Sequence, residues 1–137
     1  MTVFRNTAVL ILFALASFPL GALAEDVEGW RPSTSEAIVL PKFCWRQFLG
    51  DKFKGPPYEI PRELCGVGTN HYCPALVLLN RANKSSYDSG HRRGFLEGAK
   101  KKTLYTLKAI EKFPRCPLHR EAESTYQIIE RRLRELW

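Results

Sequence analysis

Apolar residues recur at steps of three and four along the second half of the chain, which is the period of an amphipathic helix. The pattern predicts three helices, over residues 70–82, 92–113 and 118–136. A polar break at residues 83–90 separates the first two, and Pro114 and Pro117 separate the last two. Short connections make successive helices antiparallel neighbours. We therefore expect an all-α fold, either a three-helix antiparallel bundle or a helical hairpin.

The region before these helices has a different pattern. Aromatic residues alternate there with turn formers, and Gly-Pro-Pro at 55–57 excludes a helix or a central strand at that point. We expect an irregular, aromatic and proline-rich region with two short helical turns, over residues 43–49 and 62–65. The first long helix then starts at Thr69 or Asn70, which are both good N-cap residues, with Pro74 in its first turn.

The first 24 residues have the layout of a secretory signal peptide. One basic residue, Arg5, is followed by an apolar run over 8–18 and by Ala22-Leu23-Ala24. The run is shorter than the ~20 apolar residues that a membrane span needs. Cleavage after residue 24 of the 137 leaves a mature chain of 113 residues.

The mature chain divides into two parts. Residues 25–41 mix glycine, proline, serine and charge without a sustained period, and we expect a flexible arm there. Residues 42–137 form a single domain without a membrane span. Its cysteine content and the predicted signal peptide place it in a periplasm or outside the cell.

Four cysteines, Cys44, Cys65, Cys73 and Cys116, indicate two disulfides in a small exported domain. Three pairings are open. Cys73 lies near the predicted start of the first long helix, and Cys116 follows the end of the second. Those ends are neighbours in an antiparallel pair, which favours Cys73–Cys116 and leaves Cys44–Cys65 to close the proline-rich loop.

A metal site is the alternative use of the same residues. Two histidines accompany three of the cysteines, and the candidate ligands for zinc or copper are Cys65, His71, Cys73, Cys116 and His119. Thiols in an oxidising compartment usually pair with one another. We therefore favour disulfides, in which case no cofactor is expected.

The chain lacks the short motifs that carry common chemistry. It has no G-x-S-x-G, H-E-x-x-H, Walker A, G-x-G-x-x-G, C-x-x-C or C-x-x-C-H sequence. Without such a motif the sequence favours a binding or assembly module over an enzyme.

Charge points to an acidic partner. Lys and Arg number 21 against 14 Asp and Glu, a formal net charge of +7. The candidate binding residues are Lys100, Lys101, Lys102, Arg131, Arg132 and the aromatic Trp45. The competing interpretation is a solvated helix face, with Trp45 in the core. Export argues against a nucleic acid and leaves a protein or an anionic component of the cell envelope.

Several short segments together resemble a known group of sequences. They are CW at 44–45, CG at 65–66, NHYCPAL at 70–76, LYTLKAI at 104–110 and CP at 116–117. The group comprises small exported proteobacterial proteins with a cysteine-bearing NHYC segment. The resemblance covers residues 43–133 and implies export and a bacterial origin. It assigns no activity and no residue role, so the function predicted remains that of an exported binding or assembly module, with a periplasmic metal-binding protein as the alternative.

Overall fold

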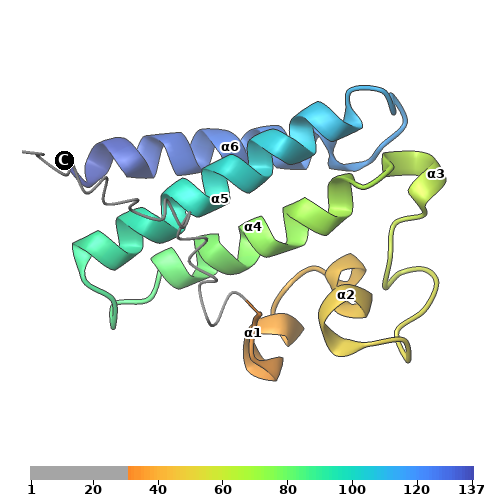
Figure 1. Ribbon diagram of the computed structural model, residues 1–137, viewed down its shortest axis with the longest axis horizontal. Coiled ribbons are helices and arrows are strands. Elements are labelled where there is room, and N and C mark those ends of the chain that lie inside the picture. Colours follow the sequence, from red (N-terminus) through yellow and green to blue (C-terminus); the bar gives the residue numbers. More distant parts are fainter. Residues whose placement is uncertain (1–30) are drawn as a thin grey trace, which may run out of the picture.

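The computed structural model describes residues 31–137, and the predicted signal peptide and residues 25–30 lie outside this range. The described chain is helical and contains no strand. Its elements are α1 (Thr34–Ile38), η1 (Lys42–Cys44), α2 (Trp45–Leu49), α3 (Arg62–Cys65), α4 (Gly68–Ala82), α5 (Ser89–Ile110) and α6 (Leu118–Glu135). The predicted all-helical class is confirmed (Figure 1). Across residues 31–137, none of the helices combines the length and the apolar character that crossing a bilayer requires.

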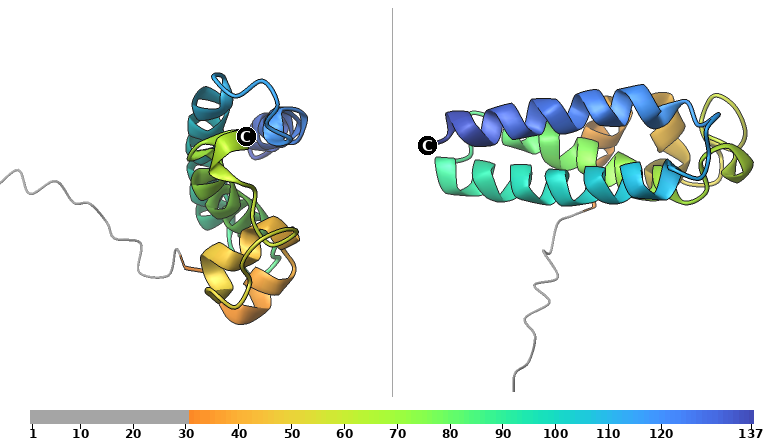
Figure 2. Two further views of the ribbon diagram at one scale, coloured as in Figure 1. Left: turned by 90° about the vertical axis from the view of Figure 1, so that its right-hand side faces the viewer. Right: turned by 90° about the horizontal axis from the view of Figure 1, so that it is seen from above.

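The three long helices run back and forth along the molecule. In Figure 1, α5 returns alongside α4, and Figure 2 shows α5 and α6 side by side when the molecule is seen from above. Helix α5 begins at Ser89, earlier than the sequence pattern indicated, because Asp88 caps it. The Asp88 carboxylate accepts a hydrogen bond of 2.8 Å from the backbone N–H of His91.

The start of α4 differs from the prediction. The helix begins at Gly68, and the N-cap position is taken by Val67, which makes no side-chain capping bond. Thr69 and Asn70, expected as the cap, therefore lie inside the helix. Pro74 becomes its seventh residue and has no N–H for the Asn70 carbonyl four residues earlier. The Gln47 side chain compensates by donating a hydrogen bond of 3.0 Å to that carbonyl.

Helix α4 lies between two layers of the molecule. On one side of α4, Tyr72 is fully buried in a cluster with Ile110 of α5. The next residue, Cys73, is buried on the other side with Cys44 of the N-terminal layer, which we define as residues 31–60. Figure 2, in the end-on view, shows this layer on one side of α4 and the long helices α5 and α6 on the other. Helix α4 therefore has two buried faces.

Helices α4 and α5 approach closely where α4 begins. A Cβ atom on Gly68 would lie 2.4 Å from Cγ2 of Ile110, so only glycine fits there without a shift. Next to this contact, the hydroxyl of Thr106 donates to the Gly68 carbonyl at 3.1 Å. The close approach sets how the two helices pack.

The two disulfides join Cys44 to Cys73 and Cys65 to Cys116, with Cα atoms 5.5 Å and 4.9 Å apart. The prediction of two disulfides is confirmed, but the predicted pairing, Cys73–Cys116 and Cys44–Cys65, is wrong. Because α4 begins at Gly68, Cys73 is its sixth residue and faces the N-terminal layer. Cys65, which precedes α4, takes the place beside Cys116 that the prediction gave to Cys73.

Each disulfide fastens a different part of the chain. The Cys44–Cys73 bridge ties the N-terminal layer to α4, and the Cys65–Cys116 bridge ties α3 to the loop between α5 and α6. The bridges close loops with sequence separations of 29 and 51 residues. Loop-closure entropy gives such bridges a stabilisation of about 4 kcal/mol each.

The prediction that residues 25–41 form a flexible arm is wrong for the described part of that range, residues 31–41. Thr34–Ile38 form α1, which a capping box begins: the Ser33 hydroxyl accepts from the Glu36 N–H, and the Glu36 carboxylate accepts from the Ser33 N–H. Ala37 and Leu40 are buried, with 1% and 4% of their surface exposed. Burial of apolar residues therefore fixes this segment on the domain.

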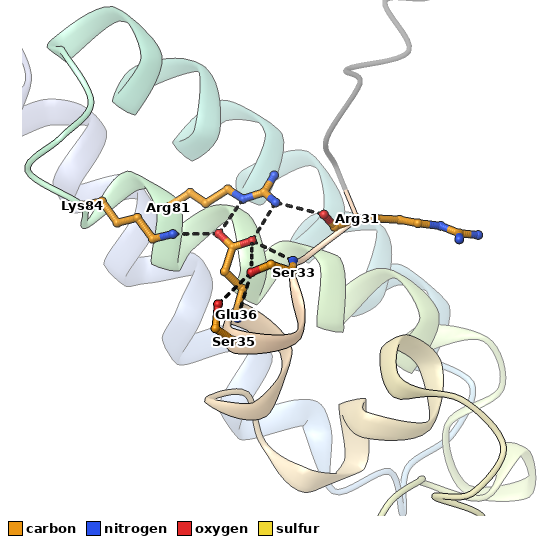
Figure 3. Close-up of polar contacts among 6 residues, drawn as sticks. All are labelled: Arg31, Ser33, Ser35, Glu36, Arg81 and Lys84. Carbon is orange, nitrogen blue, oxygen red and sulfur yellow. Dashed lines mark hydrogen bonds and ion pairs between the residues drawn. The ribbon is translucent and has the colours of Figure 1, made fainter.

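An ion pair joins α1 to α4. The Glu36 carboxylate accepts two hydrogen bonds of 3.0 Å from Arg81, from Nε and Nη2, and one of 2.8 Å from Lys84 (Figure 3). Arg81 also donates to the Arg31 carbonyl at 3.1 Å. This cluster holds the start of the described chain against the far half of α4.

Candidate functional site

The predicted metal ligands are not assembled into a site. All three cysteines of that set, Cys65, Cys73 and Cys116, form disulfides, so their sulfurs are not the thiolates that zinc or copper requires. Across residues 31–137, no three or more Cys, His, Asp or Glu side chains are grouped to hold a metal ion. The predicted cysteine ligands are therefore not available to a metal ion in this structure.

The two histidines of that set have separate surroundings. His71 lies on α4, with its ring 3.8 Å from the ring of Tyr105 on α5. Burial, helped by the nearby charge of Lys102, lowers the pKa of His71 and favours the neutral ring. His119 donates a hydrogen bond of 3.0 Å from Nε2 to the Phe113 carbonyl and so braces the loop before α6.

The three consecutive lysines do not form one patch. Successive residues of a helix point about 100° apart. Lys100 accordingly pairs with Glu130 of α6, and Lys102 lies close enough to His71 of α4 to affect its charge. Lys101 is exposed between these two directions and has no ion-pair partner in the described part of the chain.

The two arginines predicted on the last helix are engaged within the protein. Arg131 lies 3.9 Å from Glu135, one turn further along α6. Arg132 donates a hydrogen bond to the Asn83 side chain, which joins α6 to the end of α4. Only the first of these contacts joins opposite charges, since the Asn83 side chain is uncharged.

Trp45 has the surroundings of a packed residue. Its ring lies 5.3 Å from Phe53 and 5.7 Å from Tyr58, and its Nε1 donates to the Leu40 carbonyl at 3.1 Å. The side chain is only partly exposed. The contacts favour the core interpretation of Trp45 over a binding surface.

A groove between α5 and α6 has the features of a binding site. Its apolar lining comes from Leu104 of α5, Leu133 of α6 and the C-terminal Trp137, around a cavity of about 370 Å³. Leu104 is 43% exposed and Trp137 is 92% exposed. Large apolar side chains that gather in an exposed hollow are typical of an interaction surface.

Charged side chains form the rim of this groove. They are Arg93, Glu97, Lys100 and Lys101, all from α5. The guanidinium of Arg93 lies over the Trp137 ring, 3.8 Å from its centroid, and steadies that ring by a cation–π contact. The hydrogen bond from Lys100 to Glu130 raises the pKa of the lysine and holds it in the charged form.

The packing beneath the groove holds its two walls at a fixed distance. Leu96 and Ala99 of α5 and Ile129 of α6 are buried in one cluster, with Leu133 packed against it. Four groove residues of α5, Arg93, Glu97, Lys101 and Leu104, follow one another at steps of four, four and three and so share one side of the helix. Lys100 borders that side where it pairs with Glu130 of α6. A rigid helix pair thus presents the groove.

Sequence reasoning placed part of this groove and missed the rest. Lys100 and Lys101 were candidate binding residues, whereas Leu104 and Trp137 were not. Trp137 follows Leu133 by four residues, which would place both on one side of a helix that continued to the end of the chain. That spacing is the signal that could have identified the site.

Comparisons with protein-family models, with curated proteins and with solved structures each find no match, so the groove itself carries the functional argument.

Proposed function

We propose that this protein is a helical binding module of an oxidising compartment, periplasmic or secreted, which holds a segment of a partner protein in the groove between α5 and α6. In this proposal α4, α5 and α6 act as an antiparallel three-helix bundle, to which the disulfides fasten the N-terminal layer. The signal-peptide pattern of residues 1–24 and the two disulfides support the compartment.

The exposure of Trp137 carries the proposal. The side chain is 92% exposed, yet Arg93 holds its ring at the mouth of a groove that also contains Leu104 and Leu133. A tryptophan held in place before binding loses little conformational freedom when a partner covers it. Tryptophan and arginine are also the residues that most often dominate the free energy of binding at protein interfaces.

A protein segment fits this groove better than a small molecule does. The hollow is open to solvent and is lined by a row of α5 residues together with Leu133 of α6 and Trp137, whereas sites for small ligands usually enclose most of the ligand surface. Recognition of a helix in a groove between two helices requires such an open apolar channel.

The test is site-specific photo-crosslinking in cells that make the protein. A photoreactive residue replaces Leu104 in the groove, and in a matched control it replaces Gln127, an exposed residue of α6 that does not line the groove. We expect the photoreactive residue at position 104 to form one crosslinked adduct that the residue at position 127 does not form. Mass spectrometry then identifies the partner protein in that adduct, and the partner is purified. Equal labelling at both positions contradicts the proposal.

The purified partner then allows a quantitative check. We expect Trp137→Ala to weaken its binding by about tenfold or more. Val39→Ala should leave the affinity unchanged, because Val39 is 69% exposed but lies in the N-terminal layer, outside the groove. Unchanged affinity of the Trp137→Ala variant contradicts the proposal.

A further inference from the structure

We infer that the segment held in the groove is an acidic amphipathic helix of about three turns. This inference rests on the proposed function and names the chemistry of the partner at the same site. Three observations carry it: the charge along the rim, the weakness of the ion pair between Arg93 and Glu97, and the length of the lining.

The rim of the groove has an excess of positive charge. Arg93, Lys100 and Lys101 stand against two carboxylates, Glu97 in the lining and Glu130 beside it, so the excess at the groove itself is one positive charge. On the same side of α5, two turns beyond Lys101, Lys108 is exposed and has no ion-pair partner within residues 31–137. A partner with carboxylates beside its apolar residues therefore complements the groove.

The ion pair between Arg93 and Glu97 leaves the arginine available to a partner, whereas Lys100 is held more closely by Glu130. Arg93 and Glu97 are 3.9 Å apart, and 64% of the Glu97 side chain is exposed. Pairs of this kind contribute little to stability, so a partner carboxylate can replace Glu97 at low cost. Lys101 has no ion-pair partner within residues 31–137, so a partner carboxylate can bind it without displacing another group.

The lining has the length of a short helix. From Arg93 to Leu104 there are eleven residues of α5, which rise about 16 Å and correspond to three helical turns. Leu104 marks one end of this length, and Trp137, in contact with Arg93, marks the other. A helix with apolar residues at i and at i+7 to i+11 can reach both ends and present carboxylates on either side.

The carboxylates at the site argue against an anionic membrane as the occupant. Glu97 lines the groove, and Glu130 of α6 lies beside it as the partner of Lys100. Both carboxylates would repel a flat layer of anionic headgroups, whereas a helix can place its negative charges opposite the cations alone. The hollow shape of the site also favours a rod over a plane.

The experiment uses synthetic probes and the full mature chain. One labelled peptide of 14 residues carries leucines on one side of a helix with glutamates beside them. A second has glutamine in place of every glutamate, and vesicles of phosphatidylglycerol form the third probe. Binding is followed by fluorescence anisotropy for the peptides and by co-sedimentation for the vesicles.

We expect the acidic peptide to bind at least about tenfold more tightly than the neutral one, with an affinity that falls as salt is added. Lys101→Gln should weaken it by about threefold to tenfold. Lys42→Gln is the matched control, because Lys42 is an exposed lysine outside the groove, and it should have no effect.

Three results would overturn the inference and leave the groove intact as a binding site. They are equal binding of the two peptides, tight binding of the vesicles that depends on Lys101, and binding of neither peptide when the partner still crosslinks at Leu104. Failure of the crosslink at Leu104 together with failure of both peptides would instead remove the proposed function itself.

Discussion

The Glu36 carboxylate meets the Arg81 guanidinium through two parallel hydrogen bonds of 3.0 Å, with 18% and 10% of the two side chains exposed (Figure 3). Fork-to-fork geometry of this kind is the strongest arrangement of an arginine and a carboxylate. Because Glu36 lies in α1 and Arg81 lies in α4, the pair links the N-terminal layer to the long helices. We therefore expect this ion pair to affect both the free energy of unfolding and its dependence on pH.

Glu36→Gln should lower the free energy of unfolding by about 2–3 kcal/mol, because it leaves the charge of Arg81 without its carboxylate in a largely buried position. Chemical denaturation at neutral pH measures the change. Glu123→Gln is the matched control: Glu123 is an exposed carboxylate of α6 without an ion pair in the described structure, and its replacement should change little. A loss no larger than that of the control would contradict the assigned role.

The same pair makes stability depend on pH in acid. The hydrogen bonds from Arg81, with those from Lys84 and Ser33, hold the pKa of Glu36 well below its ordinary value of 4.5. The unfolded chain therefore takes up a proton near pH 4.5 that the folded protein does not bind, so the contribution of Glu36 is present above that pH and is lost as the pH falls below it. As the pH falls from about 5 to about 3, the free energy of unfolding should decrease more steeply for the wild-type protein than for the Glu36→Gln variant.

Gly68→Ala should destabilise the protein by about 1–3 kcal/mol, because the new methyl group would overlap Ile110 where α4 and α5 approach. Gly94→Ala, at a position of α5 with open space around its Cα, should instead raise stability by about 0.5–1 kcal/mol through helix propensity. Thermal unfolding of the two variants provides the comparison. Equal shifts in one direction would contradict the close packing of the helices.

Tyr72→Phe should cost about 1–2 kcal/mol. The buried Tyr72 hydroxyl lies 3.2 Å from the Glu121 carboxylate and 2.9 Å from the Thr125 hydroxyl, and burial raises the pKa of the phenol. The substitution leaves the Thr125 hydroxyl without this partner. Tyr105→Phe, at a half-exposed site on α5, is the control and should be close to neutral in denaturant titrations.

The disulfide pairing can be read directly from peptides prepared without reduction. Cys65 and Cys73 lie in one tryptic peptide, since no lysine or arginine separates them, so cleavage after Tyr72 by chymotrypsin is required. We expect fragments that join Cys44 to Cys73 and Cys65 to Cys116. Joint replacement of either pair by alanine should lower the free energy of unfolding by about 3–4 kcal/mol. Any other linkage would show that the layers are packed differently.

The local sequence pattern was enough to predict the long helices but not which segments of the chain pack against them. The three- and four-residue period indicated α5 and α6 to within a few residues, and the short helix Arg62–Cys65 was predicted with its bounds. The pattern could not show that α4 is buried on two faces, because the second face is covered by residues 31–60, which are distant in sequence. Both the wrong disulfide pairing and the predicted flexible arm follow from that omission.

The binding groove shows the same limit. Consecutive lysines at 100–102 look like one patch in the sequence, but the helix turns Lys102 toward His71 of α4, and Glu130 already engages Lys100, one of the two lysines at the groove. Conversely, Leu104 and Trp137 are 33 positions apart and meet at one groove only because α6 returns along α5. The capping box from Ser33 to Glu36 was a further missed signal that a local pattern did contain.

Oxidative footprinting of Trp137 measures whether a partner covers the groove in cells. The protein is exposed to hydroxyl radicals once in purified form and once inside cells that make it, and oxidation of Trp137 is compared with that of Tyr105, which is half exposed and does not line the groove. If a partner occupies the groove, Trp137 is oxidised readily in the purified protein and protected in cells, while Tyr105 reacts alike in both. Equal oxidation of Trp137 in the two samples would show that no partner covers the groove.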